Sequence, residues 1–336
     1  VQTFIGAAEP EEIIFTRNTT EGLNLVAYSY GLSRIHAGDE ILVSVMEHHS
    51  NLLPWQMVCR QTGASLRFLE CEPDGHLDLD KAAQMITDRT RIVAVTQLSN
   101  VLGQIYSIRE LAALAHAKGA VIVVDGAQST PHIPVDVRAL DADFFAFSGH
   151  KLYGPMGIGV LYGRRALLDA MPPFLTGGEM IESVSRESAV FAELPHKFEA
   201  GTVNAAGAAG LHAALEYVRG IGFDVIRQRE QELASYAFSR MQDIPHVRIL
   251  GSAQPEQHNG ILTFTLDGVH PHDISEILAA DGVAVRAGHH CAQPLMHHLG
   301  VSATVRASIA FYNTAEDIDR FIDTLSTVRE RMGYGK

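Results

Sequence analysis

The sequence has few cysteines and few positive charges. Cys59, Cys71 and Cys291 are the only cysteines among 336 residues, and their spacing fits neither a disulfide framework nor a zinc ribbon. The formal net charge is -13 at pH 7, whereas binding to a phosphate backbone depends on clustered Lys and Arg. The composition therefore argues against a disulfide-stabilised secreted domain and against nucleic acid as a partner.

Long hydrophobic runs are also missing. No apolar stretch approaches the length of a transmembrane helix, and residues 1–12 lack the charged and apolar regions of a signal peptide. We therefore expect a cytoplasmic protein with no membrane partner. Hydrophobic residues make up 46% of the chain and charged residues 19%, which is typical of a compactly folded protein. The length suggests roughly two domains.

Short β-branched runs alternate with amphipathic stretches from residue 12 onward. This rhythm predicts βαβ units and an α/β fold with a mostly parallel sheet covered by helices. The runs 91–95 and 121–125 are almost entirely apolar, as expected for strands that are buried on both faces. Beyond residue 245 the order of strands and helices changes. We predict a large domain at residues 1–220 and a smaller C-terminal α+β domain at residues 221–336.

Local signals define some of the predicted elements. Ser107 and Glu110 have the spacing of a capping box at a helix start, and Gly119 can end that helix. Thr314 is expected to open the last helix. The glycine-rich and polar stretch 175–204 is too irregular for the sheet, so it predicts a long functional loop.

Lys151 follows the apolar run 144–149 and precedes a glycine-rich segment. A lysine that attacks the aldehyde of a cofactor must first lose its charge, and a buried site favours this. Asp125 ends the run 121–125, and ligands of open α/β sheets bind beyond the carboxyl ends of strands. Asp125 could pair with the protonated ring nitrogen of pyridoxal 5′-phosphate (PLP), and Gln128 could contact the phenolic oxygen. A surface lysine and polar turn residues are the ordinary alternatives.

Hydroxyl groups follow the predicted strand 12–17, where Thr19 and Thr20 open a helical pattern. Hydroxyls and backbone N–H groups at a helix start bind anions, so these threonines are candidates for a phosphate, together with Ser148 and His150. Ordinary N-capping by either threonine explains the pattern equally well.

His48 and His49 follow the predicted strand 40–45. A histidine at this position could stack on a pyridine ring and exchange protons near neutral pH. Two adjacent histidines could instead bind a metal or be merely exposed.

Cys291 directly follows His289 and His290, with Arg286 close by. A thiol attacks as the thiolate, and neighbouring cationic or imidazole groups lower its pKa. Cys291 is therefore the best candidate nucleophile. The His-His-Cys triplet lacks the second ligand pair of a structural zinc site, so no metal is predicted.

Arg306 is a candidate to bind a substrate carboxylate through its two-pronged guanidinium, with Asn100 assisting. A surface ion pair is the common alternative role of an arginine.

Seven motifs together resemble group II cysteine desulfurases of the SufS type, in the class V branch of the fold-type I PLP enzymes. Selenocysteine lyases and CsdA-type enzymes are similar. The motifs are TTEG, EHHSN, LSNVLG, VDGAQ, SGHKLYGP, EAGTVN and RAGHHCAQPL. The resemblance implies that the chain converts L-cysteine to L-alanine and passes the sulfur to a SufE- or SufU-type acceptor for iron–sulfur cluster assembly.

The resemblance also implies a role for each candidate residue. Lys151 would hold PLP as a Schiff base and move protons, and Cys291 would carry the persulfide. A threonine from the other subunit completes the phosphate site in the family, which implies a homodimer. The further implied roles are ring pairing by Asp125, stacking by His48, contact with the phenolic oxygen by Gln128, phosphate binding by Thr19, Thr20, Ser148, His150 and Thr202, substrate binding by Asn100 and Arg306, and a place by the cysteine loop for Arg286.

Several alternatives stay open. A selenocysteine lyase or cysteine sulfinate desulfinase would use the same catalytic residues, and L-selenocysteine could be a second substrate. A class V aminotransferase would need no thiol, and a non-catalytic sulfur carrier or metal-binding protein would need no PLP. Family members have a segment before the strand at 12–17, so we expect this chain to be a shortened form.

Overall fold

The computed structural model describes residues 1–334, which form two compact units. The large unit comprises Val1–Leu69, Asp78–Gln97 and Ser107–Ile221. The small unit comprises Glu70–Leu77, Leu98–Tyr106 and the described part of Gly222–Lys336. Two short segments from the N-terminal half thus belong to the small unit, and the domain boundary at residue 220 stays a prediction.

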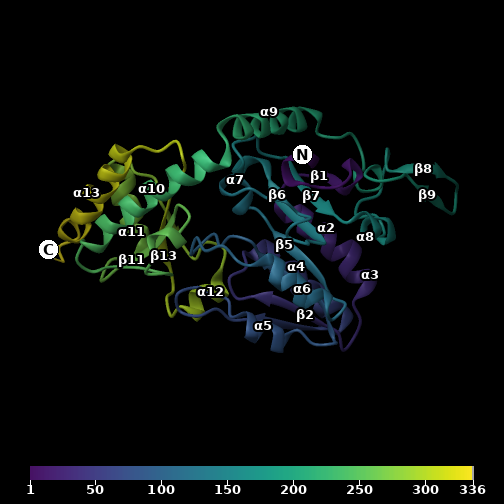
Figure 1. The fold of residues 1–336 in the computed structure, drawn as a ribbon, viewed down its shortest axis with the longest axis horizontal. Helices are drawn as coiled ribbons and strands as arrows, with labels where there is room; N and C mark the ends of the chain where they lie inside the picture. Colours follow the sequence, from purple (N-terminus) through teal and green to yellow (C-terminus); the bar gives the residue numbers. More distant parts are fainter. Residues whose placement is uncertain (335–336) are drawn as a thin grey trace. The chain divides into compact units, whose positions relative to one another are not determined.

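The large unit contains a seven-stranded sheet in the order β1-β7-β6-β5-β4-β2-β3 (Figure 1). The five strands from β6 to β3 run parallel. At one edge β7 pairs antiparallel with β6, and β1 pairs antiparallel with β7. The predicted α/β fold with a mostly parallel sheet is therefore confirmed. The strands are β1 Ile13–Thr16, β2 Glu40–Ser44, β3 Ser65–Leu69, β4 Thr90–Thr96, β5 Val121–Asp125, β6 Phe144–Ser148 and β7 Gly159–Gly163.

Helices pack on the sheet through apolar faces, as α6 shows. In α6, Ile108, Leu111, Ala112 and Ala115 are buried, which is the spacing of a single helical face. The helices of this unit are α1 Gln2–Ile5, α2 Thr19–Leu25, α3 Leu32–Arg34, α4 Leu53–Thr62, α5 Leu79–Met85, α6 Ile108–His116, α7 Ser129–His132, α8 Arg165–Ala170 and α9 Ala205–Ile221. Single 3-10 turns include η3 His49–Asn51 and η4 Gly149–Lys151, and the π-helix η2 Val26–Gly31 joins α2 to α3.

Two local expectations need correction. Ser107 does precede α6, but within residues 1–334 its side chain accepts no capping hydrogen bond, so the predicted capping box is wrong. The stretch 175–204 is not only a loop, since β8 Ile181–Val184 and β9 Ala189–Phe191 form a two-stranded hairpin. Figure 1 shows this hairpin projecting from the large unit. Its side chains are mostly exposed on both faces, so they lack the alternating pattern that reveals a half-buried strand.

The small unit contains a four-stranded antiparallel sheet in the order β10-β11-β13-β12. The strands are β10 Val247–Ile249, β11 Ile261–Leu266, β12 Arg286–Gly288 and β13 Thr304–Ser308, and the helices are α10 Phe223–Gln242, α11 Pro271–Ala280, α12 Gln293–His298 and α13 Ala315–Arg331. Phe264 and Phe321 pack in its core, with ring centroids 6.0 Å apart. Thr314 opens α13 as expected, because its hydroxyl accepts the N–H of Asp317 at 3.2 Å.

No helix among residues 1–334 is long and apolar enough to cross a membrane.

Candidate active site

Three neighbouring parallel strands of the large unit end in polar residues. Thr96 ends β4, Asp125 ends β5 and Ser148 ends β6, and Thr96 pairs with Asp125 in the sheet register. The turn η4 follows β6 directly and carries His150 and Lys151. Because β4, β5 and β6 run parallel, these residues gather at one edge of the sheet, where ligands of open α/β sheets bind.

Asp125 is the most deeply buried acid at this edge apart from Glu47, with 4% of its surface exposed. Its Oδ1 accepts the N–H of Ala127 at 2.9 Å. Burial raises the pKa of Asp125, while the positive charge of Lys151 and the hydrogen bond from Ala127 oppose this shift. A buried carboxyl that a nearby cation helps to ionise suits the pairing with a protonated ring nitrogen.

Thr19 and Ser148 form a contact between the start of α2 and the end of β6. The N–H of Thr19 donates to Ser148 Oγ at 2.8 Å, and the two hydroxyl oxygens lie 2.6 Å apart. Asn18 caps α2, because its Oδ1 accepts the N–H of Glu21 at 3.0 Å. The alternative that a threonine caps this helix is therefore wrong, and the threonine hydroxyls are left to other partners.

A second hydroxyl contact links Thr20 to His48 through Ser50. Thr20 Oγ1 lies 2.7 Å from Ser50 Oγ, which lies 3.0 Å from His48 Nδ1. The backbone N–H of Ser50 also donates to His48 Nδ1, at 3.1 Å. Since Nδ1 accepts this bond, the neutral imidazole carries its proton on Nε2. Sequence reasoning missed Ser50, although it stands in the EHHSN motif beside His48.

The other cofactor candidates of the large unit lie in more open positions. Gln128 is half-buried at the start of α7, and His150 is exposed. Burial and the charge of Lys151 lower the pKa of His150, which favours a neutral imidazole as a hydrogen-bond partner.

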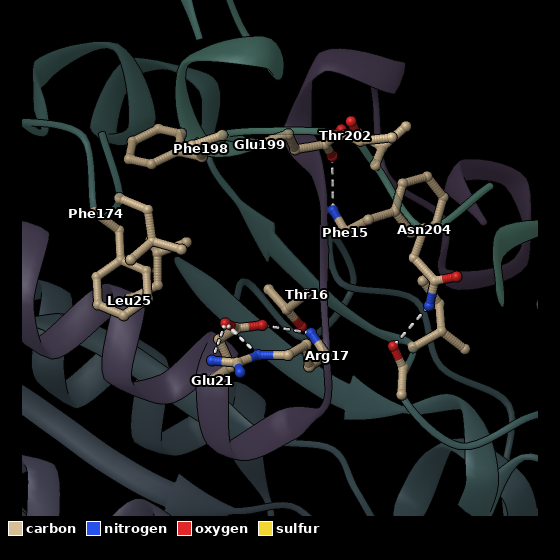
Figure 2. A pocket seen from close by; sticks show the side chains of 15 residues that line it. Phe15, Thr16, Arg17, Glu21, Leu25, Phe174, Phe198, Glu199, Thr202 and Asn204 are labelled. Carbon is tan, nitrogen blue, oxygen red and sulfur yellow. Dashed lines mark hydrogen bonds and ion pairs between the residues drawn. The ribbon is translucent and has the colours of Figure 1, made fainter. Parts of the chain in front are cut away.

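Thr202 lines a pocket of about 340 Å³ on the large unit, which the other phosphate candidates do not line (Figure 2). Apolar side chains such as Phe15 and Phe174 line this pocket, as does the ion pair of Arg17 with Glu21 at 2.8 Å. The structure thus brings Thr19, Ser148 and the turn η4 together but places Thr202 elsewhere on the large unit.

Cys291 lies in the small unit, directly after β12. The Nη2 of Arg286 lies 3.4 Å from Cys291 Sγ, and the pairing of β12 with β13 sets Arg286 opposite Arg306. Burial and the positive charge of Arg286 lower the pKa of Arg306 to about 10, and Cys291 opposes this shift. Two cations opposite each other on one sheet are unfavourable alone, so the pair favours an anion, whether thiolate or carboxylate.

Hydrogen bonds that involve Asn100 and His290 hold the loop that carries Cys291 in place. The Nδ2 of Asn100 donates to the backbone oxygen of His290 at 2.9 Å, and Arg306 Nη1 donates to the backbone oxygen of Asn100 at 2.8 Å. His290 and Cys291 have φ of 52° and 56°, a conformation that is costly for residues other than glycine.

His290 is held neutral in this loop. Burial, followed by the charges of Arg306 and Arg286, lowers the pKa of His290 to about 3, and its Nε2 lies 2.7 Å from the Oγ1 of Thr304. His290 therefore supplies no positive charge to the thiol at neutral pH and holds the loop through Thr304, so the cation beside Cys291 is Arg286. No group of three or more His, Cys, Asp or Glu side chains in the described part of the chain could hold a metal ion.

The side chains at the sheet edge fit PLP. A buried carboxyl beside a lysine suits the ring nitrogen and aldehyde, and the hydroxyls of Thr19 and Ser148 suit a phosphate. The fit rests on the burial and donor chemistry of these residues.

Comparison with known proteins agrees with this chemistry. A family model described as aminotransferase class-V matches residues 1–321. A protein of Halalkalibacterium halodurans named probable cysteine desulfurase is 50% identical over 334 residues, which cover 99% of this chain and 82% of that protein.

Two solved structures are similar over nearly the whole chain. The cysteine desulfurase CsdA of Escherichia coli, solved in an S-sulfonic acid form, is 43% identical with a TM-score of 0.95, covering 98% of this chain and 82% of that one. A C-DES mutant with glycine covalently linked to the PLP cofactor is 25% identical with a TM-score of 0.85, covering 97% of this chain and 83% of that one. The chain belongs to the class V aminotransferase family.

Proposed function

We propose that this chain is a PLP-dependent cysteine desulfurase that converts L-cysteine to L-alanine and retains the sulfur as a persulfide on Cys291. The observation that carries this choice is the contact of the Cys291 thiol with Arg286 at 3.4 Å, opposite Arg306. A class V aminotransferase would not need this thiol. The names of the relatives support the same activity.

The large unit supplies the cofactor site in this proposal. Lys151 binds PLP covalently, Asp125 holds the ring nitrogen, and His48 stacks on the ring. When bound, PLP withdraws electrons from the substrate Cα and so stabilises negative charge there. Gln128 contacts the phenolic oxygen, and the phosphate is bound by Thr19, Thr20, Ser148 and His150.

Lys151 moves the proton of the substrate Cα. Only a neutral amine can accept that proton, so Lys151 acts once its Nζ has been released uncharged. Asp125 stays in place as the buried counter-charge at the end of β5. His48 keeps its proton on Nε2 because Ser50 occupies Nδ1.

Cys291 then takes the sulfur atom. The Arg306 guanidinium binds the substrate carboxylate as a fork, with Asn100 assisting, and the charge of Arg286 favours the thiolate. Cys291 Sγ attacks the substrate sulfur, so an S–S bond forms while the C–S bond breaks. The electron pair of the broken bond stays on carbon, which is protonated to give alanine. Positioning dominates this step, because both sulfurs must reach near-attack distance.

Mass spectrometry tests the proposal directly. After exposure to L-cysteine, we expect one extra sulfur atom on Cys291 and one alanine released per sulfur. Cys59→Ala is the matched control, since burial raises the pKa of the Cys59 thiol to about 11 and keeps it unreactive. Cysteine desulfurase activity that survives Cys291→Ala would contradict the proposal, as would a purified chain with no borohydride-trappable adduct on Lys151.

Turnover of other substrates separates the alternatives. L-selenocysteine and L-cysteine sulfinate share the Cα chemistry, but their turnover does not require attack by the Cys291 thiolate. If the Cys291→Ala variant loses only turnover of L-cysteine, the thiol role is specific to desulfuration. Formation of pyridoxamine phosphate from an amino donor would instead favour an aminotransferase.

We extend the proposal to partners. A homodimer in which Thr202 of one subunit completes the phosphate site of the other is supported by the exposure of Thr202 and of Leu175 and Val203, which line the same pocket. A mixture of the inactive Lys151→Ala and Thr202→Ala variants should then regain activity, since each mixed dimer has one intact site.

The persulfide is passed to a SufE- or SufU-type acceptor for iron–sulfur cluster assembly. The three cysteines, all in the described residues and all free thiols, suit the cytoplasm.

A further inference from the structure

Glu47 is a buried acid that the proposed chemistry does not use. It lies between β2 and His48, and only 1% of its surface is exposed. Its Oε1 accepts the backbone N–H of Thr96 at 3.0 Å and the hydroxyl of Ser44, and its Oε2 accepts the Nδ2–H of Asn51 at 2.6 Å. The carboxyl group therefore joins the ends of β2 and β4 to the turn η3.

The orientation of the Asn51 amide is fixed from its other side. Asn51 Oδ1 accepts the Nε1–H of Trp55 at 3.1 Å, so its Nδ2 faces Glu47. Asn51 and Trp55 are fully buried. Both oxygens of Glu47 thus face donors, and the Ser44 hydroxyl can donate to a carboxylate or accept from a protonated carboxyl group. An amide at this position would place its NH2 against a donor.

Glu47 and Asn51 enclose the segment that carries His48. The ring of His48 is held within this segment by Ser50, and the carboxyl group ties the segment to two strands. We propose that Glu47 is a positioning residue for His48, because its carboxyl group closes this turn and fixes it to the ends of β2 and β4. The inference rests on the proposed function only for the stacking role of His48.

The cost of burying this acid supports a specific role. Burial raises the pKa of Glu47 to about 8, against the hydrogen bonds from Ser44, Asn51 and Thr96, and the charge of Asp125 adds to the rise. An apolar or amide residue would avoid this cost if the turn needed only packing.

Two variants separate the hydrogen bonds from the mere presence of a polar side chain. In Glu47→Gln, one end of the amide must place its NH2 against a donor, either Asn51 Nδ2–H or the Thr96 N–H. The paired variant Glu47→Gln/Asn51→Asp moves the carboxylate across the same hydrogen bond. A carboxylate at position 51 can accept from the glutamine and from Trp55, so the paired variant should rebuild the turn.

Chemical labelling of His48 reads its placement without any substrate. Diethylpyrocarbonate reacts with histidine rings, and peptide mass spectrometry of the full chain gives the rate at His48 relative to the exposed His212. We expect Glu47→Gln to raise the relative rate about tenfold, the factor of one lost buried hydrogen bond, and the paired variant to return it to within about twofold of the wild type. A paired variant that keeps the fast rate, or that does not fold, overturns the proposal.

The affinity for PLP shows whether Glu47 acts through His48. Glu47→Gln should weaken PLP binding about tenfold in the wild-type background and less than about twofold in the His48→Ala background. Equal effects in both backgrounds would show a merely structural role and overturn the proposal. If the wild-type chain binds no PLP, the proposed function fails, whereas the labelling of His48 still decides the role of Glu47.

Discussion

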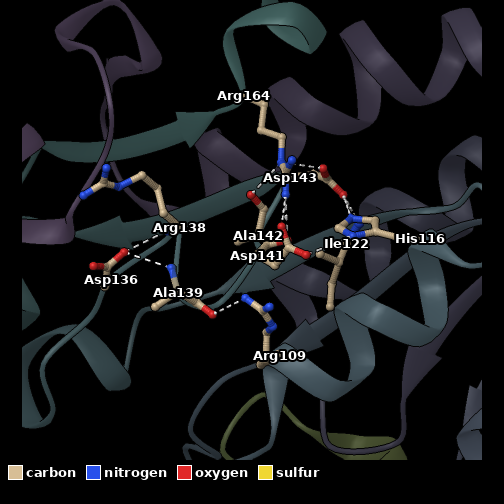
Figure 3. Close-up of polar contacts among 10 residues, drawn as sticks. All are labelled: Arg109, His116, Ile122, Asp136, Arg138, Ala139, Asp141, Ala142, Asp143 and Arg164. Atoms are coloured by element: carbon tan, nitrogen blue, oxygen red, sulfur yellow. Dashed lines mark hydrogen bonds and ion pairs between the residues drawn. The ribbon is translucent and has the colours of Figure 1, made fainter.

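Acidic side chains lie at both ends of the parallel strands in the large unit, but they differ in pKa and in their partners. At the carboxyl ends, burial raises the pKa of both Asp125 and Glu47, and the charge of Asp125 adds to the rise for Glu47. At the amino ends of β5 and β6, Asp141 and Asp143 face Arg164 and make close ion pairs with it (Figure 3). Burial thus favours the protonated acids at the carboxyl ends, whereas Arg164 pairs with both aspartates at the amino ends.

The contacts of Asp143 show how complete this neutralisation is. Its Oδ1 lies 2.9 Å from Arg164 Nε, and its Oδ2 accepts the Ile122 N–H at 2.8 Å and lies 2.8 Å from His116 Nε2. Burial would raise the pKa of Asp141, but the hydrogen bond and charge of Arg164 prevail and lower it. The carboxyl ends, where Asp125 is buried near Lys151, are the edge at which we expect the ligand and are called the ligand edge. The amino ends, where Asp143 is paired with Arg164 and His116, are called the structural edge.

The largest effect on activity should follow from a substitution at the ligand edge. With Asp125→Asn, the buried counter-charge for the ring nitrogen is lost, and we expect kcat with L-cysteine to fall on the order of 100-fold. The free energy of unfolding of the cofactor-free chain at pH 7 should not fall, because a costly buried charge has been removed. Steady-state kinetics and urea unfolding check both parts. A kcat within about threefold of the wild type would show that Asp125 has no electrostatic role.

The matched change at the structural edge is Asp143→Asn. The amide oxygen can still accept the Ile122 N–H, but the charge that Arg164 and His116 contact is gone. We expect the free energy of unfolding to fall by about 2 kcal/mol, with kcat unchanged. Urea unfolding and kinetics on the same preparation measure this. A loss of kcat as large as that of Asp125→Asn would remove the distinction between the two edges.

Glu47 and Asp141, which lie at the two different edges, should make contributions to stability that depend on pH in opposite directions. Native Glu47 holds its proton more tightly than the unfolded chain does, so its contribution to stability is lost as the pH rises from its ordinary value of 4.5 to about 8. The pKa of Asp141 is lowered, so its contribution is present above the ordinary value of 3.8 and is lost as the pH falls.

Urea unfolding of the cofactor-free chain from pH 3 to pH 9 tests the direction of both pH dependences. Relative to the wild type, Glu47→Gln should flatten the decline toward pH 8, and Asp141→Asn should flatten the decline at acid pH. The same slope change from both variants would contradict the assignment.

Much of the fold could be predicted from the sequence, because buried strands and one-sided helices leave periodic patterns. The apolar runs 91–95 and 121–125 became β4 and β5, and the residues at their ends form the candidate site. The hairpin of β8 and β9 escaped prediction because strands that are exposed on both faces carry no such pattern. The membership of Glu70–Leu77 and Leu98–Tyr106 in the small unit depends on tertiary packing, which no local motif encodes.

The candidate site was predictable where chemistry is carried by single residue types. Lys151, Asp125 and Cys291 stay predictions, made from their places in the sequence and from the resemblance of the motifs around them. Ser50 and Glu47 were missed because their roles are hydrogen bonds to other parts of the fold. In the sequence, Ser50 and Glu47 look like ordinary turn residues near His48. Their hydrogen-bond partners become visible only once the strands are assembled.

The smallest predicted effect concerns the starts of two helices, α2 and α6. Asn18 caps α2 through its side chain at the ligand edge, whereas the Ser107 side chain does not cap α6 within residues 1–334. Asn18→Ala should lower the free energy of unfolding by about 1 kcal/mol, and Ser107→Ala by no more than a few tenths. Both losses are measured by urea unfolding without cofactor. Equal losses would mean that Ser107 does cap α6 in solution, and they would restore the capping box that its spacing from Glu110 suggests.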